Sequence, residues 1–127
     1  MAEAGSLRRG DVVLLEGEPF RIDSIQSVVI SKHSHTKIKM DLTGIFSGTK
    51  KILSLSPHKT MEKVDIKRKH GQLIAKISED VGQIMDMMDY TIYEAHVPKD
   101  LMERIGEGDE LTYIEYGGRV KVLEARK

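Results

Sequence analysis

The residues best suited to chemistry lie together at positions 31–37, where the chain reads SKHSHTK. Lysines, histidines and hydroxyls in one short run suit four kinds of site: a metal site, a phosphate cradle, a nucleic-acid contact, or a lysine displayed for modification. His33 and His35 would share one face of a strand, but a closed zinc site needs two further ligands, and the other histidines are remote in sequence. The run therefore favours a cationic loop that meets phosphate, with the histidines as adaptable donors.

Other motifs give weaker signals. The stretch GIFSGTKK at 44–51 has the lysine and hydroxyl of a P-loop in reversed order and too short a glycine spacing. The chain has no cysteine, which excludes disulfides, thiol catalysis and cysteine-based zinc sites. The methionine-rich run IMDMM at 84–88 predicts filler for a hydrophobic core. Four tyrosines have rings that can stack on bases, but no interleaving of aromatic and basic residues supports that use: Tyr90, Tyr93, Tyr113 and Tyr116.

The polar run must be positioned by the elements on either side of it. Residues 11–17 and 18–30 read as two strands with a turn at residues 17–19. Between positions 37 and 42, apolar residues alternate with Lys or Asp, which predicts a half-buried strand with its charges in solvent. A further strand follows the glycines of 44–48. Turns at intervals of about 8 to 12 residues are typical of a small barrel or sandwich.

The second half shows a different order of elements. Three strand-like runs lie between positions 71 and 97, and Pro98 suits the first turn of a short helix that Gly106 ends. Gly117 and Gly118 predict a two-residue turn in a final hairpin. Strands, one helix and two more strands match a five-stranded oligonucleotide-binding (OB) barrel.

The charge is unevenly divided along a chain whose net charge is zero. Residues 1–70 hold 13 Lys and Arg against 8 Asp and Glu, whereas residues 71–127 hold 7 against 12. A basic half favours a surface that faces a polyanion, although mutual attraction of the two halves is the alternative. The run KRKHG at 67–71 marks the junction, so we expect domains at 1–67 and 68–127, with one continuous strand through this run as the alternative. Neither a signal-peptide core nor an apolar run of about 18 residues occurs, which predicts a cytoplasmic protein without membrane contact.

The run KHSHTK at 32–37 resembles KHGHAK, the hallmark loop of the translation initiation factor 5A family. The resemblance extends over the whole chain, since GDVVLLEGEPFRI, GIFSGTKK, HGQLIA and VGQIMDMMDYTIYEAHVP are also similar to family segments. The chain looks more like an archaeal member than a eukaryotic one, which has a longer N-terminal extension, or than bacterial elongation factor P, which has a third domain. The resemblance implies an all-β fold, with a basic SH3-like (KOW-type) small barrel in 1–67 and an acidic five-stranded OB barrel with one short helix in 68–127.

The resemblance also implies a function. In this family a deoxyhypusine synthase uses NAD to move an aminobutyl group from spermidine onto one lysine, which would be Lys32, giving deoxyhypusine or hypusine. The factor itself would be no enzyme and would hold no cofactor or metal. It would bind the ribosome beside the peptidyl-tRNA, as a monomer or weak dimer, and promote peptide bond formation at stalls such as consecutive prolines. The residues expected to contact tRNA or rRNA are Ser31, His33, Ser34, His35 and Lys37.

Three departures from the family loop carry consequences. Ser31 and Ser34 stand where the family usually has glycine, which predicts a stiffer tip, and Val29 replaces a lysine, which removes one phosphate contact. The alternative function is an unmodified RNA-binding module of the OB type, which would bind naked RNA without any dependence on Lys32. A histidine-based metalloenzyme is a third reading, and it predicts bound metal in the purified protein.

Overall fold

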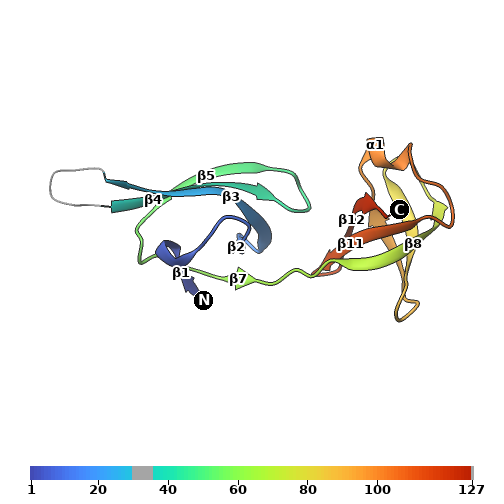
Figure 1. Cartoon of the computed structure of the whole chain (residues 1–127), viewed down its shortest axis with the longest axis horizontal. Helices are drawn as coiled ribbons and strands as arrows, with labels where there is room; N and C mark the ends of the chain where they lie inside the picture. The colour runs from blue at the N-terminus through green and yellow to red at the C-terminus, as the bar shows by residue number, and fades with distance from the viewer. Residues whose placement is uncertain (30–35, 127) are drawn as a thin grey trace. The chain divides into compact units, whose positions relative to one another are not determined.

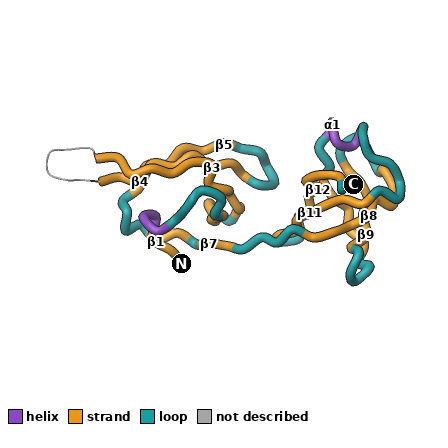
Figure 2. The backbone as a smooth tube through the Cα atoms, in the orientation of Figure 1, coloured by secondary structure: helices purple, strands orange, loops and turns teal. Residues whose placement is uncertain are grey.

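A computed structural model describes residues 1–29 and 36–126, which divide into two compact units, Met1–Asp65 and Ile66–Lys127 (Figure 1). Each unit has a hydrophobic core of its own. The division falls two residues before the expected boundary, within a strand-free segment between Val64 and Lys69. Strands make up most of both units, and Figure 2 shows how little helix there is. Within the described part of the chain, no helix has both the length and the apolar character needed to cross a membrane.

The first unit is built around one antiparallel five-stranded sheet in the order β5-β4-β3-β2-β7, with β5 and β7 as its edges. A two-stranded ribbon of β1 and β6 and a 3-10 turn at Ala4–Ser6 add to the same core. The arrangement is the SH3-like unit that the family resemblance implies. Its strands are β1 (Ala2–Glu3), β2 (Val12–Leu15), β3 (Glu18–Val29), β4 (Thr36–Gly44), β5 (Lys50–Leu55), β6 (Thr60–Met61) and β7 (Lys63–Val64).

The alternation predicted for positions 37–42 is confirmed on β4. Ile38, Met40 and Leu42 are buried, whereas Lys39 and Asp41 are exposed. Successive side chains of a strand point to opposite faces, so this pattern turns one face of β4 to the core and the other to solvent.

The turn between β2 and β3 lies one residue earlier than expected. Glu16 and Gly17 form it, both with positive φ (53° and 78°), and Leu15 pairs with Glu18. Positive φ at both central residues gives a twist that matches the flanking strands, which is why this two-residue turn forms. Pro19 therefore lies in β3 opposite Leu14 and not in the turn.

The second unit is a closed five-stranded barrel in the order β10-β12-β11-β8-β9. A parallel pairing of β10 with β12 at His96 and Lys121 closes it, and α1 lies in sequence between β10 and β11. This is the OB topology, so the expected fold class is confirmed. The elements are β8 (Lys69–Lys76), β9 (Val81–Asp86), β10 (Ile92–His96), α1 (Lys99–Met102), β11 (Glu110–Tyr116) and β12 (Arg119–Ala125).

The helix α1 is shorter than expected but buries the expected residues. It begins after Pro98 and ends at Met102, and the buried side chains of Leu101, Met102 and Ile105 join the core of the barrel. The final hairpin turns at Gly117 and Gly118, with φ of 58° and 83°, as the sequence predicts.

Candidate functional site

The hairpin formed by β3 and β4 carries the polar run. Val29 and Thr36 are its last described pair, so residues 30–35 connect the two strands. The predicted modification site Lys32 lies outside the described residues, as do its predicted neighbours Ser31, His33, Ser34 and His35. Lys37, the remaining predicted contact, lies on β4 opposite Val28 and is half-buried, so it belongs to a strand and not to the connecting loop.

This hairpin is longer than the sheet that supports it. On β3, pairing with β2 ends at Arg21, and on β4, pairing with β5 begins only at Ile38. We call the outer part of the hairpin, residues 24–29 and 36–41, the hairpin arm (Figure 1). Its outermost apolar side chain, Val29, is 69% exposed. Outward of Arg21 on β3 and of Ile38 on β4, the described strands pair only with each other.

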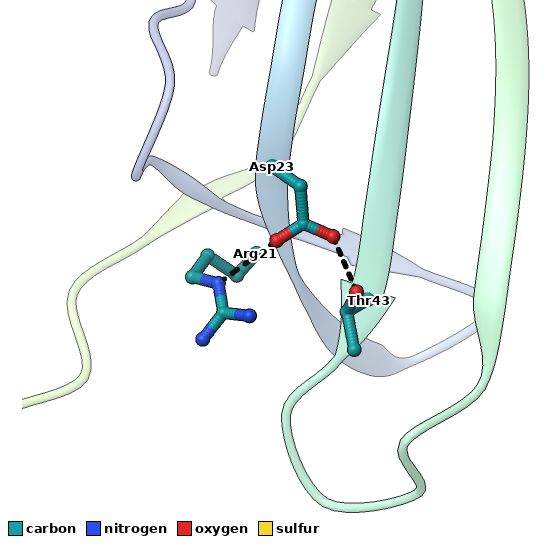
Figure 3. A network of polar contacts seen from close by, with 3 residues as sticks. All are labelled: Arg21, Asp23 and Thr43. Atoms are coloured by element: carbon teal, nitrogen blue, oxygen red, sulfur yellow. Dashed lines mark hydrogen bonds and ion pairs between the residues drawn. The ribbon is translucent and has the colours of Figure 1, made fainter.

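A β-bulge lies at the base of the hairpin arm. The register shifts between Ile22 and Ser24, which leaves Asp23 as the extra residue of β3. Figure 3 shows its carboxylate between the hydroxyl of Thr43, which donates to Oδ2, and Nε of Arg21, which lies 3.1 Å from Oδ1. Because a bulge bends its strand and increases the local twist, this group of residues sets the direction in which the arm leaves the sheet.

The hydrogen bonds at the bulge also fix the charge there. The Thr43 hydroxyl lowers the pKa of Asp23 below its ordinary value, helped by Arg21 and by the charge of Lys50, against a smaller opposing effect of burial. Asp23 is therefore ionised at neutral pH. The hydroxyl of Ser24 donates to Oδ2 of Asp41 at 2.6 Å, which is a second side-chain hydrogen bond between β3 and β4 next to the bulge.

Sequence reasoning missed this bulge, although the sequence holds a signal for it. The apolar positions Phe20 and Ile22 are two apart, but the next one, Ile25, is three further on. A strict strand alternates with a period of two, so one extra residue between Ile22 and Ile25 indicates a bulge.

Cations line the hairpin and its neighbouring strand. Lys39 is exposed on the hairpin arm, and Lys37 lies two residues nearer the polar run. Lys51 is already engaged, since its Nζ lies 5.3 Å from the centroid of the Phe20 ring and 3.9 Å from Oε2 of Glu16. Lys37 and Lys39 are therefore the described cations best placed to support a polyanion at residues 30–35.

The predicted charge contrast between the halves is weaker in the structural units. The first unit has ten basic and eight acidic residues, and the second has ten and twelve. The difference arises because Lys67, Arg68 and Lys69 belong to the second unit. Positive charge is therefore available on both units.

The four tyrosines of the second unit have different surroundings. Tyr113 is fully buried and donates its hydroxyl to Oδ2 of Asp86 at 2.5 Å, and the Tyr93 ring packs on it with centroids 5.7 Å apart. Burial, with the Asp86 carboxylate beside it, raises the pKa of Tyr113 far above its ordinary value. Tyr90 is largely exposed. Buried rings such as Tyr113 are unable to stack on bases, which leaves Tyr90 as the exposed candidate in this group.

The expectation that the methionine-rich run fills the core is wrong for its last two members. Met87 and Met88 are exposed, because they lie in the turn after β9 ends at Asp86. Ile84 is buried and Met85 is half-buried, as alternation on β9 requires. The run therefore passes from core to surface at Asp86.

Metal ligands do not gather in the described residues, where no three side chains of His, Cys, Asp or Glu come together. His33 and His35 lie outside those residues, so the histidine metal site stays a prediction.

The fold and hairpin together define a class of protein: a small two-domain β protein, with an SH3-like unit that extends a cation-bearing hairpin and an OB barrel that follows it. No protein-family model matches the chain. The translation initiation factor 5A of Methanococcoides burtonii is 38% identical over 121 residues, which cover 94% of each chain. That of Pyrobaculum aerophilum is 33% identical over 127 residues, which cover 98% of this chain and 91% of the relative.

A solved structure described as eukaryotic translation initiation factor 5A from Methanococcus jannaschii is similar to this one, with a TM-score of 0.81, 32% identity and coverage of 98% and 92% of the two chains. A second solved structure, described as a translation initiation factor eIF-5A family protein from Naegleria fowleri, has a TM-score of 0.76 at 24% identity and shares the fold. The chain belongs to the translation initiation factor 5A family, so the predicted family is confirmed. Its relatives are translation factors, and this chain is one too.

Proposed function

We propose that this chain acts on the ribosome next to peptidyl-tRNA and promotes peptide bond formation at stalling sequences such as consecutive prolines. It does so through Lys32, which a deoxyhypusine synthase extends with an aminobutyl group from spermidine, using NAD, to give deoxyhypusine or hypusine. The factor holds no cofactor of its own, works in the cytoplasm as a monomer or weak dimer, and is not an enzyme.

The observation that carries the proposal is the hairpin arm. Its strands stay paired out to Val29 and Thr36, where neither has a second neighbouring strand among the described residues, and the run that contains Lys32 joins them in sequence. Loops held by a rigid scaffold are the usual carriers of function. The hydrogen bonds that hold the bulge at Asp23 supply that rigidity at the base.

The chemistry of the lysine explains why modification would help. A lysine side chain is a flexible stem with one charged amine, and adding an aminobutyl group gives a longer stem with two amines. Such a thin cationic chain fits a narrow passage lined by RNA, where a folded domain does not, and pairs with phosphates there. Lys37 and Lys39 follow the run on β4 and add attraction for the same phosphates. The ribosome performs the reaction, and the factor contributes by holding the tRNA end in place.

The test is translation of a message with consecutive prolines in a reconstituted system, with the factor taken from a host that contains the synthase. Lys32→Arg keeps the positive charge but has no amine that the synthase can extend, so rescue of the stall should disappear. Lys39→Arg is the matched control, since it makes the same exchange on the exposed face of β4 and should retain full rescue. Full activity of Lys32→Arg would disprove the proposal.

A further inference from the structure

The turn between β9 and β10, residues 87–91, gathers apolar side chains on the surface of the second unit. Met88 is 88% exposed and Tyr90 is 68% exposed, and Ile92, the first residue of β10, is 54% exposed. Single exposed apolar residues are ordinary on a protein surface, but a cluster within one turn marks a binding site.

The turn is held rigidly by the carboxylate of Asp86. Its Oδ1 accepts hydrogen bonds from the backbone N–H groups of Met88 at 2.8 Å and Asp89 at 3.1 Å, and its Oδ2 accepts the Tyr113 hydroxyl. The N–H of Tyr90 donates to the carbonyl oxygen of Asp86 at 3.0 Å. The exposed side chains are therefore presented in one arrangement before any partner arrives, which reduces the entropy lost on binding.

Tyr90 lies in a conformation that its side chain does not favour. Its φ is 62°, in the left-handed region that suits glycine or asparagine. An aromatic residue at such a position, with its ring in solvent, contributes little to the stability of the fold. Strained positions of this kind concentrate at binding sites, so the ring at this position points to a ligand.

A basic segment, residues 67–70, reaches the turn at its last residue, His70. The N–H of Met87 donates to the carbonyl oxygen of His70 at 2.9 Å, and Gly71 pairs with Asp86 across β8 and β9. Residues 67–70, which read KRKH, are all exposed and belong to the same unit as the turn. Arg68 is 3.5 Å from Oε1 of Glu124 in an exposed ion pair, and the charge of Lys69 reaches Asp86.

We propose that the β9–β10 turn and residues 67–70 form a contact site for single-stranded RNA. A base stacks on the ring of Tyr90, and neighbouring phosphates pair with the ammonium groups of Lys67 and Lys69. An exposed ring beside a row of cations is the combination that binds single strands without sequence preference, because every base has a π face. An apolar pocket of a protein partner would contact the exposed ring but would not pair with the cations. RNA would bind both the ring and the cations.

The site shares Ile92 with the surface that OB barrels commonly use, which is the outer face of their second and third strands, but its ring and cations lie outside that face. Here that face, on β9 and β10, pairs Gln83 with Glu94 and Met85 with Ile92. With the third pair, Val81 and His96, this face supplies an acid, an amide, an imidazole and apolar groups, but no lysine or arginine. The contact has instead moved to the end of the barrel where β8 begins, and it does not depend on Lys32.

The test measures binding of the full chain to a fluorescein-labelled, unstructured A/U RNA of about 12 nucleotides by fluorescence anisotropy over a series of salt concentrations. Tyr90→Asn removes the ring and suits the left-handed backbone, so the fold stays intact while Kd rises about tenfold, as removal of one stacked base implies. Tyr90→Phe keeps the ring and should bind within about twofold of the wild type. The double variant Lys67→Ala, Lys69→Ala should flatten the slope of log K against log salt by about 1.4, or ~0.7 for each phosphate that is no longer neutralised.

Two comparisons decide the outcome. Lys76→Ala removes one lysine at the opposite end of β8 and should leave both affinity and salt slope unchanged. Wild-type affinity in Tyr90→Asn, or an equal loss in Lys76→Ala, would overturn the proposal and assign the apolar turn to a protein partner. Rescue of the stall in Lys32→Arg judges the translation proposal, and RNA affinity in Tyr90→Asn judges this one, so the failure of each is separately visible.

Discussion

Removal of the buried hydroxyl of Tyr113 should destabilise the OB barrel. The Tyr113 hydroxyl donates to Asp86 at 2.5 Å inside a core where Tyr113 is fully buried. Tyr113→Phe keeps the ring but leaves the carboxylate without that donor. A hydrogen bond to a charged group contributes about 1.5–3 kcal/mol, and a unit of about 60 residues has a free energy of unfolding of only about 3–9 kcal/mol. A loss of ~2 kcal/mol should lower Tm by about 8–16 °C.

The loss should depend on pH. Burial raises the pKa of Asp86, but the hydrogen bond from Tyr113 and those from two backbone N–H groups outweigh it, so the pKa lies below its ordinary value. A carboxyl group with a lowered folded pKa contributes stability that is complete above its unfolded pKa of about 3.9 and is lost as pH falls through the folded value. Without the Tyr113 donor that lowering is smaller. The difference between wild type and variant should therefore be full at pH 7 and shrink below about pH 4.

Urea unfolding followed by tyrosine fluorescence measures the stability of the second unit directly, since the chain has no tryptophan and all four tyrosines lie in that unit. Tyr93→Phe is the matched control, because the Tyr93 ring packs on Tyr113 but is only half-buried, and it should change stability by less than about 0.5 kcal/mol. An effect of Tyr113→Phe no larger than that of the control, or an effect equal at pH 3 and pH 7, would refute the role assigned to Asp86.

Three further changes test the packing and the bulge. Met40→Ala, in the fully buried core of the first unit, should cost about 2–5 kcal/mol, seen as faster amide hydrogen exchange in β3 and β4; normal protection would contradict the assigned core. Gly71→Ala places a Cβ 3.2 Å from the carbonyl oxygen of Met85, so the free energy of unfolding of the second unit, measured in urea, should fall by about 1–3 kcal/mol. Unchanged stability would contradict the close approach of β8 and β9 at this position. Thr43→Val removes the main donor to Asp23, so the pKa of that carboxyl, followed by NMR titration, should rise toward its ordinary value; an unmoved titration would exclude the Thr43 contact.

The parts of the fold that were predictable depend on local rules. Alternation at positions 37–42 predicted the buried face of β4, and paired glycines at 117 and 118 predicted the turn that joins β11 and β12. The OB topology followed from the order of strands and helix, because that order leaves few ways to close a five-stranded barrel.

The parts that were missed depend on tertiary context. The turn at Glu16 and Gly17 places a non-glycine residue, Glu16, at positive φ. Residue propensities favour glycine and proline in turns, so they placed this turn at residues 17–19 instead. Burial of Tyr113 and exposure of Tyr90 follow from their places on the barrel, not from their residue type. Residues 67–70 looked like a boundary between halves, and only the pairing of Gly71 with Asp86 shows that they lie beside the exposed turn.

The central claim concerns Lys32, and peptide-mapping mass spectrometry of the protein isolated from its native host tests it most directly. The account predicts one added aminobutyl group on Lys32, with or without an oxygen, and none on Lys37 or Lys39. An unmodified Lys32 in the native protein would contradict it, and the unmodified RNA-binding function would then take its place.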